Sequence, residues 1–377
     1  MPPVYLIGRF PPPIDGQTMA TARLAALLDG TRAVHRLNVS PGDTGLVQAD
    51  VRFRPGKALH YVRLRRSLQE ALSAHPTAPV LWTSISPAPL GHLRDRLIVL
   101  PAFQPGQRVF AVIHWGNFDR VFQAAATALS ARRMVRRLAG FVFLNDQLAE
   151  RCAPWIPAEK RFVIPNTVDE AVHCTEAERR DKTDARRTRT TLRLLFLSNM
   201  IPSKGYLDVL HAVRILQARG LSLHAAFAGQ WTSEEDREAF MAVVHEHGLQ
   251  DIVTHHGGVS DRARIKALYR DADVFLLPSY YPTEAQPISI IEALNAGTPV
   301  ITTRHAGIPE MVREGREALF VPPRNPEAIA KALQELAVYD QWAVLARSAG
   351  ERFMERFSPA AVRAHWEALL ATPTPSH

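Results

Sequence analysis

The sequence predicts an α/β protein with two Rossmann-like domains, each built on a parallel sheet, and three observations support this prediction. A chain of 377 residues is longer than one hydrophobic core usually supports. Short apolar segments alternate with amphipathic stretches, which is the pattern of parallel strands flanked by helices. One strongly polar segment interrupts this alternation near the middle of the chain. We therefore expect one alternating series on each side of it.

The alternating pattern predicts ten strands and several helices. The first series has predicted strands at residues 4–7, 80–83, 109–114 and 141–144. The second series has them at residues 192–198, 223–228, 252–255, 274–277, 299–302 and 319–321. Helical patterns fill the gaps between strands, and a last helix is predicted at residues 359–370.

The polar segment sets the predicted domain boundaries. Residues 178–187 are mostly Arg, Lys, Asp and Glu, which are too polar for a core, so we interpret residues 178–191 as a linker. The first domain is then residues 1–177 and the second is residues 192–352. The remaining segment, residues 353–377, contains the last helix, which could return to the first domain.

Composition indicates an ordinary globular protein. Apolar residues make up 46% of the chain and charged residues 22%. The two cysteines, Cys152 and Cys174, lack metal-ligand spacing and are too few for a disulfide framework. No apolar segment has the length of a membrane-spanning helix, and the start lacks the features of a signal peptide. We expect a cytoplasmic protein.

Two loops that follow predicted strands carry residues suited to phosphate. Ligands of open parallel sheets bind where loops leave the carboxyl ends of the strands. The proline-rich loop of residues 8–18 ends at Gly16, where a helix begins and a backbone N–H can approach an anion closely. A tight turn explains this glycine equally well. The loop of residues 198–205 places Lys204 at the start of another helix, where its charge suits a phosphate.

A third segment pairs two glutamates across a predicted helix start. Glu284 lies in the loop after a strand, and Glu292 follows eight residues later in a helix that begins near Pro287. The N–H groups of Ile288 and Ser289 belong to the first turn, where helices leave donors without intrahelical partners. These groups are therefore candidates for binding a diphosphate between the two glutamates.

This third segment resembles the signature of family 4 glycosyltransferases. The signature has a glutamate, seven residues and a second glutamate, followed by the turn Ala-x-x-Ala-Gly-x-Pro-Val that begins at Ala293. Other matching features follow the family's order along nearly the whole chain: Gly16, residues 164–169, residues 203–205, Gly258 and residues 307–310. The resemblance implies a GT-B fold, in which two parallel sheets face a central cleft, with the acceptor in the first domain and the donor in the second.

The resemblance also implies roles for individual residues. Lys204 would hold the diphosphate, Glu292 the ribose hydroxyls and Glu284 the transferred sugar. His114, at the end of a strand, resembles the histidine that contacts the sugar, although a buried histidine of the core is the alternative.

Two positions depart from the family pattern. Asn199 replaces a common arginine, so Lys204, helix N–H groups and Arg304 would carry the leaving-group charge. Asp15 precedes Gly16 where a double glycine is common, so Gly16 alone corresponds to that motif.

The resemblance implies transfer of a hexose with retention of configuration, from a nucleoside-diphosphate sugar to a glycan or lipid-linked acceptor of bacterial polysaccharide or glycoconjugate synthesis. No metal and no other cofactor is expected, because Asp271 and Asp273 precede their strand instead of following it.

A non-catalytic nucleotide-sugar-binding subunit and a GT-B epimerase remain as alternatives. A dehydrogenase is disfavoured, since the first loop lacks Gly-x-Gly-x-x-Gly. Donor base, sugar, linkage, acceptor and oligomeric state stay open.

The basic residues suggest contact with an anionic membrane. Residues 1–185 contain 24 Lys and Arg against 16 Asp and Glu, which accounts for the whole net charge of +8. Within residues 131–138, arginines recur at helical spacing and should share one face. These are Arg132, Arg133, Arg136 and Arg137. A merely solvated helix face is the alternative, and binding of nucleic acid is disfavoured because no aromatic platform accompanies the charges.

Overall fold

The computed structural model describes residues 2–12, 16–39 and 55–372. It contains two six-stranded sheets, and every strand pair in them is parallel. The chain divides into two units. Unit 1 comprises Met1–Pro165 with Val362–His377, and unit 2 comprises Asn166–Ala361. The two sheets confirm the predicted fold class of two Rossmann-like domains. Asp15 of the first loop lies outside the described residues.

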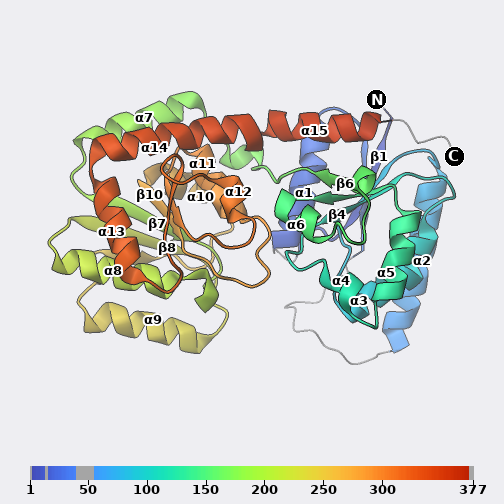
Figure 1. The fold of residues 1–377 in the computed structure, drawn as a ribbon, viewed down its shortest axis with the longest axis horizontal. Helices are drawn as coiled ribbons and strands as arrows, with labels where there is room; N and C mark the ends of the chain where they lie inside the picture. The colour runs from blue at the N-terminus through green and yellow to red at the C-terminus, as the bar shows by residue number, and fades with distance from the viewer. Residues whose placement is uncertain (1, 13–15, 40–54, 373–377) are drawn as a thin grey trace. The chain divides into compact units, whose positions relative to one another are not determined.

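The sheet of unit 1 has the order β2-β1-β3-β4-β5-β6. Figure 1 labels its strands β1, β4 and β6. Its strands are β1 (Val4–Gly8), β2 (Val34–Asn38), β3 (Val80–Trp82), β4 (Val109–Ile113), β5 (Gly140–Phe143) and β6 (Arg161–Val163). The helices are α1 (Gly16–Asp29), α2 (Pro55–Ser73), α3 (Pro89–Arg94), α4 (Arg120–Gln123), α5 (Ala128–Arg137) and α6 (Asp146–Arg151). The central strands β1, β3, β4 and β5 are buried along their whole length, which is typical of a parallel sheet covered on both faces.

The last helix, α15 (Pro359–Ala371), contributes to the core of unit 1 from Val362 onward. Trp366 and Leu369 are buried in the same cluster as Val4 of β1 and Leu28 of α1. Arg108 fixes the end of the helix by donating to the carbonyl oxygens of Leu369 (3.1 Å) and Leu370 (3.2 Å).

The sheet of unit 2 has the order β12-β11-β10-β7-β8-β9. Its strands are β7 (Leu192–Leu197), β8 (Leu223–Ala228), β9 (Val253–His255), β10 (Val274–Leu277), β11 (Val300–Thr302) and β12 (Ala318–Phe320). Along the chain, β7 is followed outward by β8 and β9, whereas β10 is followed outward by β11 and β12 on the opposite side. The neighbouring strands β7 and β10 therefore form the topological switch point of the sheet. In open parallel sheets the crevice at the carboxyl ends of such strands is the expected ligand site.

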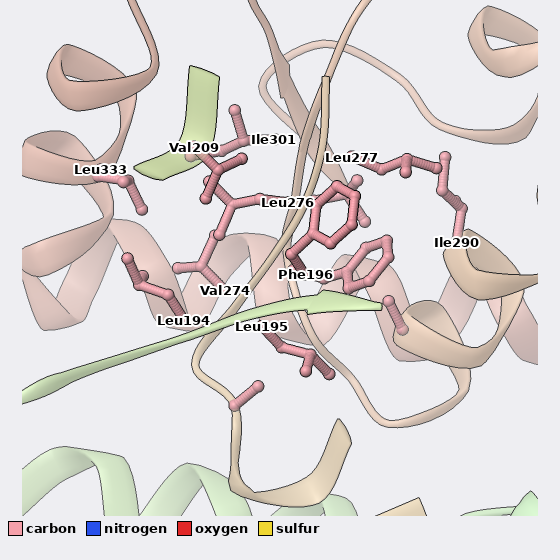
Figure 2. Packing of buried hydrophobic residues seen from close by; sticks show 14 of the residues in the cluster. Leu194, Leu195, Phe196, Val209, Val274, Leu276, Leu277, Ile290, Ile301 and Leu333 are labelled. Carbon is pink, nitrogen blue, oxygen red and sulfur yellow. The ribbon is translucent and has the colours of Figure 1, made fainter. Parts of the chain in front are cut away.

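Helices α7 to α14 complete unit 2 around one apolar core. They are α7 (Glu176–Thr188), α8 (Tyr206–Ala218), α9 (Glu234–Glu246), α10 (Arg262–Asp271), α11 (Ile288–Asn295), α12 (Ile308–Met311), α13 (Pro326–Ala337) and α14 (Tyr339–Arg352). Figure 2 shows part of this core, where side chains of neighbouring strands pack against side chains of helices. The residues labelled there are Leu194, Leu195 and Phe196 of β7, Val274, Leu276 and Leu277 of β10, Ile301 of β11, Val209 of α8, Ile290 of α11 and Leu333 of α13.

The structure differs from the prediction at the polar segment of residues 178–191. Most of it is the helix α7, which belongs to unit 2 and begins with a capping box between Thr175 and Glu178. Unit 2 accordingly starts at Asn166, before the predicted linker. Lys182 and Arg186 of this helix are buried, although their charges predicted exposure.

Three cations of α7 donate to carbonyl groups near the ends of other helices, and two of them, Lys182 and Arg186, are buried. Arg179 donates to the carbonyl oxygen of Asn295 (3.2 Å), at the end of α11, and Arg186 to that of Ala337 (2.9 Å), at the end of α13. Lys182 donates to the carbonyl oxygens of Tyr269 in α10 (2.9 Å) and Ala296 after α11 (3.3 Å). The last carbonyls of a helix have no intrahelical partner and attract cations. Helix α7 thus holds the ends of three helices together.

Two strands were not predicted, and both are edge strands of unit 1. β2 and β6 contain only partly buried or exposed positions, so they lack the continuous apolar sequence that identified the other ten. In the described part of the chain, no helix combines the length and hydropathy needed to cross a bilayer.

Candidate functional site

The loop after β7 positions Lys204 beside the loop after β10. A short 3-10 turn (Pro202–Lys204) ends at Gly205, which has a left-handed φ of 84°. A Cβ atom on Gly205 would lie 2.7 Å from the carbonyl oxygen of Pro278, so glycine is required for the close packing of the two loops. The backbone N–H of Tyr280 donates to the carbonyl oxygen of Ser203 (2.8 Å), which ties the loops together.

Lys204 and Glu284 form an ion pair at this switch point. The Lys204 Nζ lies 2.5 Å from Glu284 Oε2 and 4.7 Å from the centre of the Tyr281 ring. The buried Ser279 hydroxyl donates to the same Glu284 oxygen (3.2 Å). Both charged side chains are largely buried, with 12% and 8% of their surface exposed, so their attraction is screened less than that of a surface pair. The two residues predicted to act together do lie together.

Helix α11 begins directly after this ion pair. Pro287 precedes its first residue, Ile288, and no described side chain caps its N-terminus. Ile288 and Ser289 are half-buried, and their N–H groups lie in the first turn, where no intrahelical acceptor exists. The positive end of the helix dipole adds to this potential for binding an anion. Diphosphate binding by these two residues stays a prediction.

Glu292 lies one turn further along α11 and is paired with a cation. Its Oε1 accepts a hydrogen bond from Arg262 Nη2 (2.8 Å), and the same nitrogen is 2.6 Å from Asp169 Oδ2. Glu292 is buried, whereas Arg262 and Asp169 are partly exposed. The sequence interpretation did not identify Arg262 or assign a role to Asp169. The signal was the unusual place of Arg262 as the first residue of a helix, where the dipole disfavours a cation.

The remaining phosphate candidates of unit 2 lie differently. Asn199 is an exposed residue of the loop after β7. Arg304 is 63% exposed, pairs with Glu314 at 3.0 Å and stacks over the Phe320 ring at 4.3 Å. Arg304 therefore already has an acidic and an aromatic partner. The N–H groups of Ile288 and Ser289, in contrast, have no intrahelical acceptor.

Two predicted site residues, Gly16 and His114, belong to unit 1. Gly16 is the exposed first residue of α1, and a Cβ atom there would meet nothing within 4 Å. His114 follows β4, and its buried Nε2 has no hydrogen-bond partner among the described residues. Burial lowers the pKa of His114 to about 4, so the ring is neutral near pH 7 and can act as a hydrogen-bonding group without charge.

The predicted basic face lies on α5 of unit 1. Arg132, Arg133 and Arg136 are exposed. Arg137 is only half-buried and differs from the other three, because its Nη2 donates to the carbonyl oxygens of Phe103 (3.3 Å) and Gln104 (2.9 Å). Three of the four arginines therefore present their charge to solvent, while the fourth also holds a loop.

Exposed leucines lie near this basic face. Leu90, Leu93 and Leu97 follow helical spacing through α3 and the turn after it, with 66%, 46% and 49% of their surface exposed. Leu129 of α5 is 64% exposed. A buried hydrogen bond of 2.6 Å between His92 Nε2 and Ser130 Oγ joins α3 to α5, so the leucines and arginines occupy adjoining elements.

In residues 2–12, 16–39 and 55–372, no group of three or more His, Cys, Asp or Glu side chains is arranged to hold a metal ion.

Comparison with known sequences identifies similar proteins. A family model described as Glycosyl transferases group 1 matches residues 178–340. WcaL of Salmonella typhimurium, whose name assigns it to colanic acid biosynthesis, is 29% identical over 188 residues, which cover 48% of this chain and 45% of WcaL. The amylovoran biosynthesis glycosyltransferase AmsK of Erwinia amylovora is 28% identical over 150 residues, covering 39% and 36% of the two chains. The chain thus spans less than half the length of these two curated relatives.

Comparison with solved structures covers nearly the whole chain. A glycosyltransferase from Rickettsia africae superposes with a TM-score of 0.70 at 16% identity, over 98% of this chain and 97% of that one. Anabaena HepE in complex with UDP gives a TM-score of 0.72 at 14% identity, over 98% and 100%. At these identities the similarity establishes a common fold.

Proposed function

Residues 178–340 belong to the glycosyl transferases group 1 family, and on this premise we propose that the protein is a retaining hexosyltransferase. It transfers a hexose from a nucleoside-diphosphate sugar to a glycan or lipid-linked acceptor. The observation that carries the proposal is the arrangement at the switch point of unit 2, where Lys204, Glu284 and the first turn of α11 adjoin. This arrangement combines a cation and backbone donors, which suit a diphosphate, with a carboxylate, which suits sugar hydroxyls.

The proposed reaction develops negative charge on the leaving diphosphate. The bond between the sugar's anomeric carbon and the phosphate oxygen breaks as the acceptor oxygen bonds to that carbon on the same face. The acceptor's hydroxyl proton passes to the departing phosphate oxygen. Lys204 and the N–H groups of Ile288 and Ser289 stabilise the leaving charge, and no protein nucleophile is required. Glu284 orients the sugar, with His114 as a neutral contact.

In this proposal, Glu292 and two loop residues contribute to donor binding. Glu292 accepts hydrogen bonds from the ribose hydroxyls, while Gly16 and Asn199 contribute to the donor site through their loops. The names of WcaL and AmsK assign them to colanic acid and amylovoran synthesis, which supports a role in bacterial polysaccharide synthesis. HepE has been solved with UDP, so a uridine donor is the first to test.

The experiment that tests this function combines binding with product analysis. Uridine, guanosine and adenosine diphosphates are added to the purified protein, and one is expected to raise its thermal stability. A ligand at 100 times its dissociation constant stabilises by about 2.7 kcal/mol. The matching nucleotide sugars are then incubated with glycan or lipid-linked acceptors, and the anomeric configuration of the product is determined by NMR. Undiminished transfer in excess chelator is expected.

Each alternative function gives a different result. An epimerase converts the nucleotide sugar without any acceptor, and a non-catalytic subunit binds a nucleotide but forms no product. Absence of stabilisation by all three diphosphates contradicts a nucleotide-sugar enzyme. A strict need for added magnesium or manganese contradicts the metal-independent mechanism.

The basic and apolar surface of unit 1 supports a second proposal, peripheral binding at the inner face of an anionic membrane. This membrane face consists of Arg132, Arg133, Arg136, Leu90, Leu93, Leu97 and Leu129. Each cation near an anionic leaflet contributes on the order of 1 kcal/mol, and exposed leucines can enter the boundary between headgroups and acyl chains. Such binding would bring a lipid-linked acceptor to the enzyme.

Vesicle co-sedimentation tests the membrane face. Binding should require anionic lipid, weaken as salt rises, and fall at least about tenfold when Arg132, Arg133 and Arg136 become glutamines, because roughly 3 kcal/mol of attraction is lost. Arg137 is left unchanged since it also holds a loop. A control variant with Arg214, Arg316 and Arg347 changed to glutamine loses the same charge from exposed positions of unit 2. Equal loss in both variants, or equal binding to neutral vesicles, contradicts docking through this face.

A further inference from the structure

Arg262 connects two carboxylates in unit 2 through a single nitrogen. Its Nη2 lies 2.8 Å from Glu292 Oε1 and 2.6 Å from Asp169 Oδ2. A guanidinium Nη carries two N–H groups, so one can be donated to each carboxylate. The three residues come from distant parts of the sequence: Asp169 precedes a short turn, Arg262 begins α10, and Glu292 lies in α11.

The position of Arg262 is unfavourable by itself and is stabilised by its partners. A cation in the first turn of a helix faces the positive end of the dipole. Asp261 caps this helix by accepting from the N–H of Ala263 (2.9 Å), which offsets part of that cost. Burial acts to lower the pKa of Arg262, but Glu292 and Asp169 outweigh burial and raise it. The carboxylates of Glu292 and Asp169 thus hold the Arg262 guanidinium in place.

Glu292 depends on this arrangement in turn. Its side chain is only 5% exposed, and a buried carboxylate is costly unless a cation and hydrogen bonds compensate its charge. Lys204 forms its ion pair with the other glutamate, Glu284. Arg262 therefore supplies charge compensation to the glutamate of α11 that the proposed function assigns to ribose.

We propose that Arg262 is a positioning residue that orients Glu292 toward the ribose hydroxyls of the donor, with Asp169 fixing the guanidinium from its other side. This inference rests on the proposed function, because it needs a nucleotide donor at Glu292. A carboxylate held in one orientation by charge-assisted hydrogen bonds accepts ribose hydroxyls with a smaller ordering cost. Arginine suits this task better than lysine, since its rigid planar group directs its hydrogen bonds.

Calorimetric titration of the full chain tests the inference with matched nucleotides. The probes are uridine, guanosine and adenosine diphosphates and their 2′,3′-dideoxy counterparts, which lack the hydroxyls that Glu292 would contact. In the wild type, one ribonucleotide should bind at least about tenfold more tightly than its dideoxy form. In Arg262→Gln, the ribonucleotide should lose roughly 10- to 100-fold in affinity, while the dideoxy form changes less than about threefold.

Two further variants distinguish a positioning role of Arg262 from a general effect of its charge and from a loss of folding. Arg264→Gln removes the same charge from an exposed position of the same helix and should leave both affinities unchanged. Arg262→Lys keeps the charge without the planar group and should restore part of the ribonucleotide affinity. If Arg262→Gln does not fold, Arg262→Lys provides the test, because it should still lose more affinity for the ribonucleotide than for the dideoxy form.

The outcomes distinguish the inference from the function on which it rests. A wild type that binds none of the diphosphates overturns both. A wild type that prefers ribose, together with an Arg262→Gln variant that keeps this preference, overturns the positioning role alone. Equal losses for the ribonucleotide and its dideoxy form also overturn it, because a general charge or packing effect does not depend on the hydroxyls.

Discussion

Replacement of Lys204 by alanine is expected to lower kcat by about 10²- to 10³-fold, the effect typical of removing one group that stabilises transition-state charge. In the structure, the Lys204 charge is compensated by Glu284 at 2.5 Å. During the proposed transfer, negative charge grows on the leaving diphosphate, and an interaction that strengthens in this way acts mainly on turnover. Steady-state kinetics with the donor and acceptor identified by product analysis measure the change.

A comparison among three variants makes this expectation specific. Glu292→Ala should mainly raise the KM for the donor, because a ribose contact is present before and during the reaction. Lys266→Ala breaks another lysine–glutamate pair of unit 2, to Glu178 at 2.8 Å, and should leave both constants near those of the wild type. Thermal denaturation of each variant detects misfolding, since Lys204→Ala leaves Glu284 buried without its cation. A kcat for Lys204→Ala within about threefold of wild type contradicts the assigned role.

Replacement of Lys182 by methionine is expected to lower the free energy of unfolding of unit 2 by about 3 kcal/mol. Methionine is unbranched like lysine and one atom shorter, but it cannot donate to the carbonyl oxygens of Tyr269 and Ala296 or to the hydroxyl of Thr298. Buried acceptors that lose their donor each cost about 1–3 kcal/mol, partly offset here by removing a buried charge. Chemical denaturation monitored by circular dichroism measures the loss.

The pH of this measurement affects its interpretation. Burial lowers the pKa of Lys182 to about 7, below its value in an unfolded chain, so the unfolded state binds more protons between those two values. Stability due to this group consequently rises with pH through that window. At about pH 6 the side chain is largely an ammonium in both states, so the stability due to this group changes little with pH there. Arg180→Gln, on the exposed side of the same helix, is the control and should change stability by less than about 0.5 kcal/mol. A similarly small change in Lys182→Met contradicts the role of α7 in holding the other helices.

The sequence by itself determined the α/β class, the two sheets and most strands, because buried parallel strands are short, continuous apolar segments that local pattern reveals. The segment from Glu284 to Glu292 is equally local: a strand, a loop and a helix start follow one another, so its residues and their order along α11 were predictable. The edge strands β2 and β6 escaped prediction because exposure removes the apolar signal.

Only the tertiary structure decided which charged residues meet. Lys204 and Glu284 are 80 residues apart, and their ion pair exists because β7 and β10 are neighbours at the switch point of the sheet. The same holds for Arg262, whose partners Asp169 and Glu292 come from other elements, and for Lys182, whose acceptors lie at the ends of other helices. A charge in sequence predicts exposure, because burying it alone is costly. Only packing brings carbonyl oxygens and carboxylates from distant segments close enough to remove that cost, and this is why a segment that resembles a linker is a packed helix.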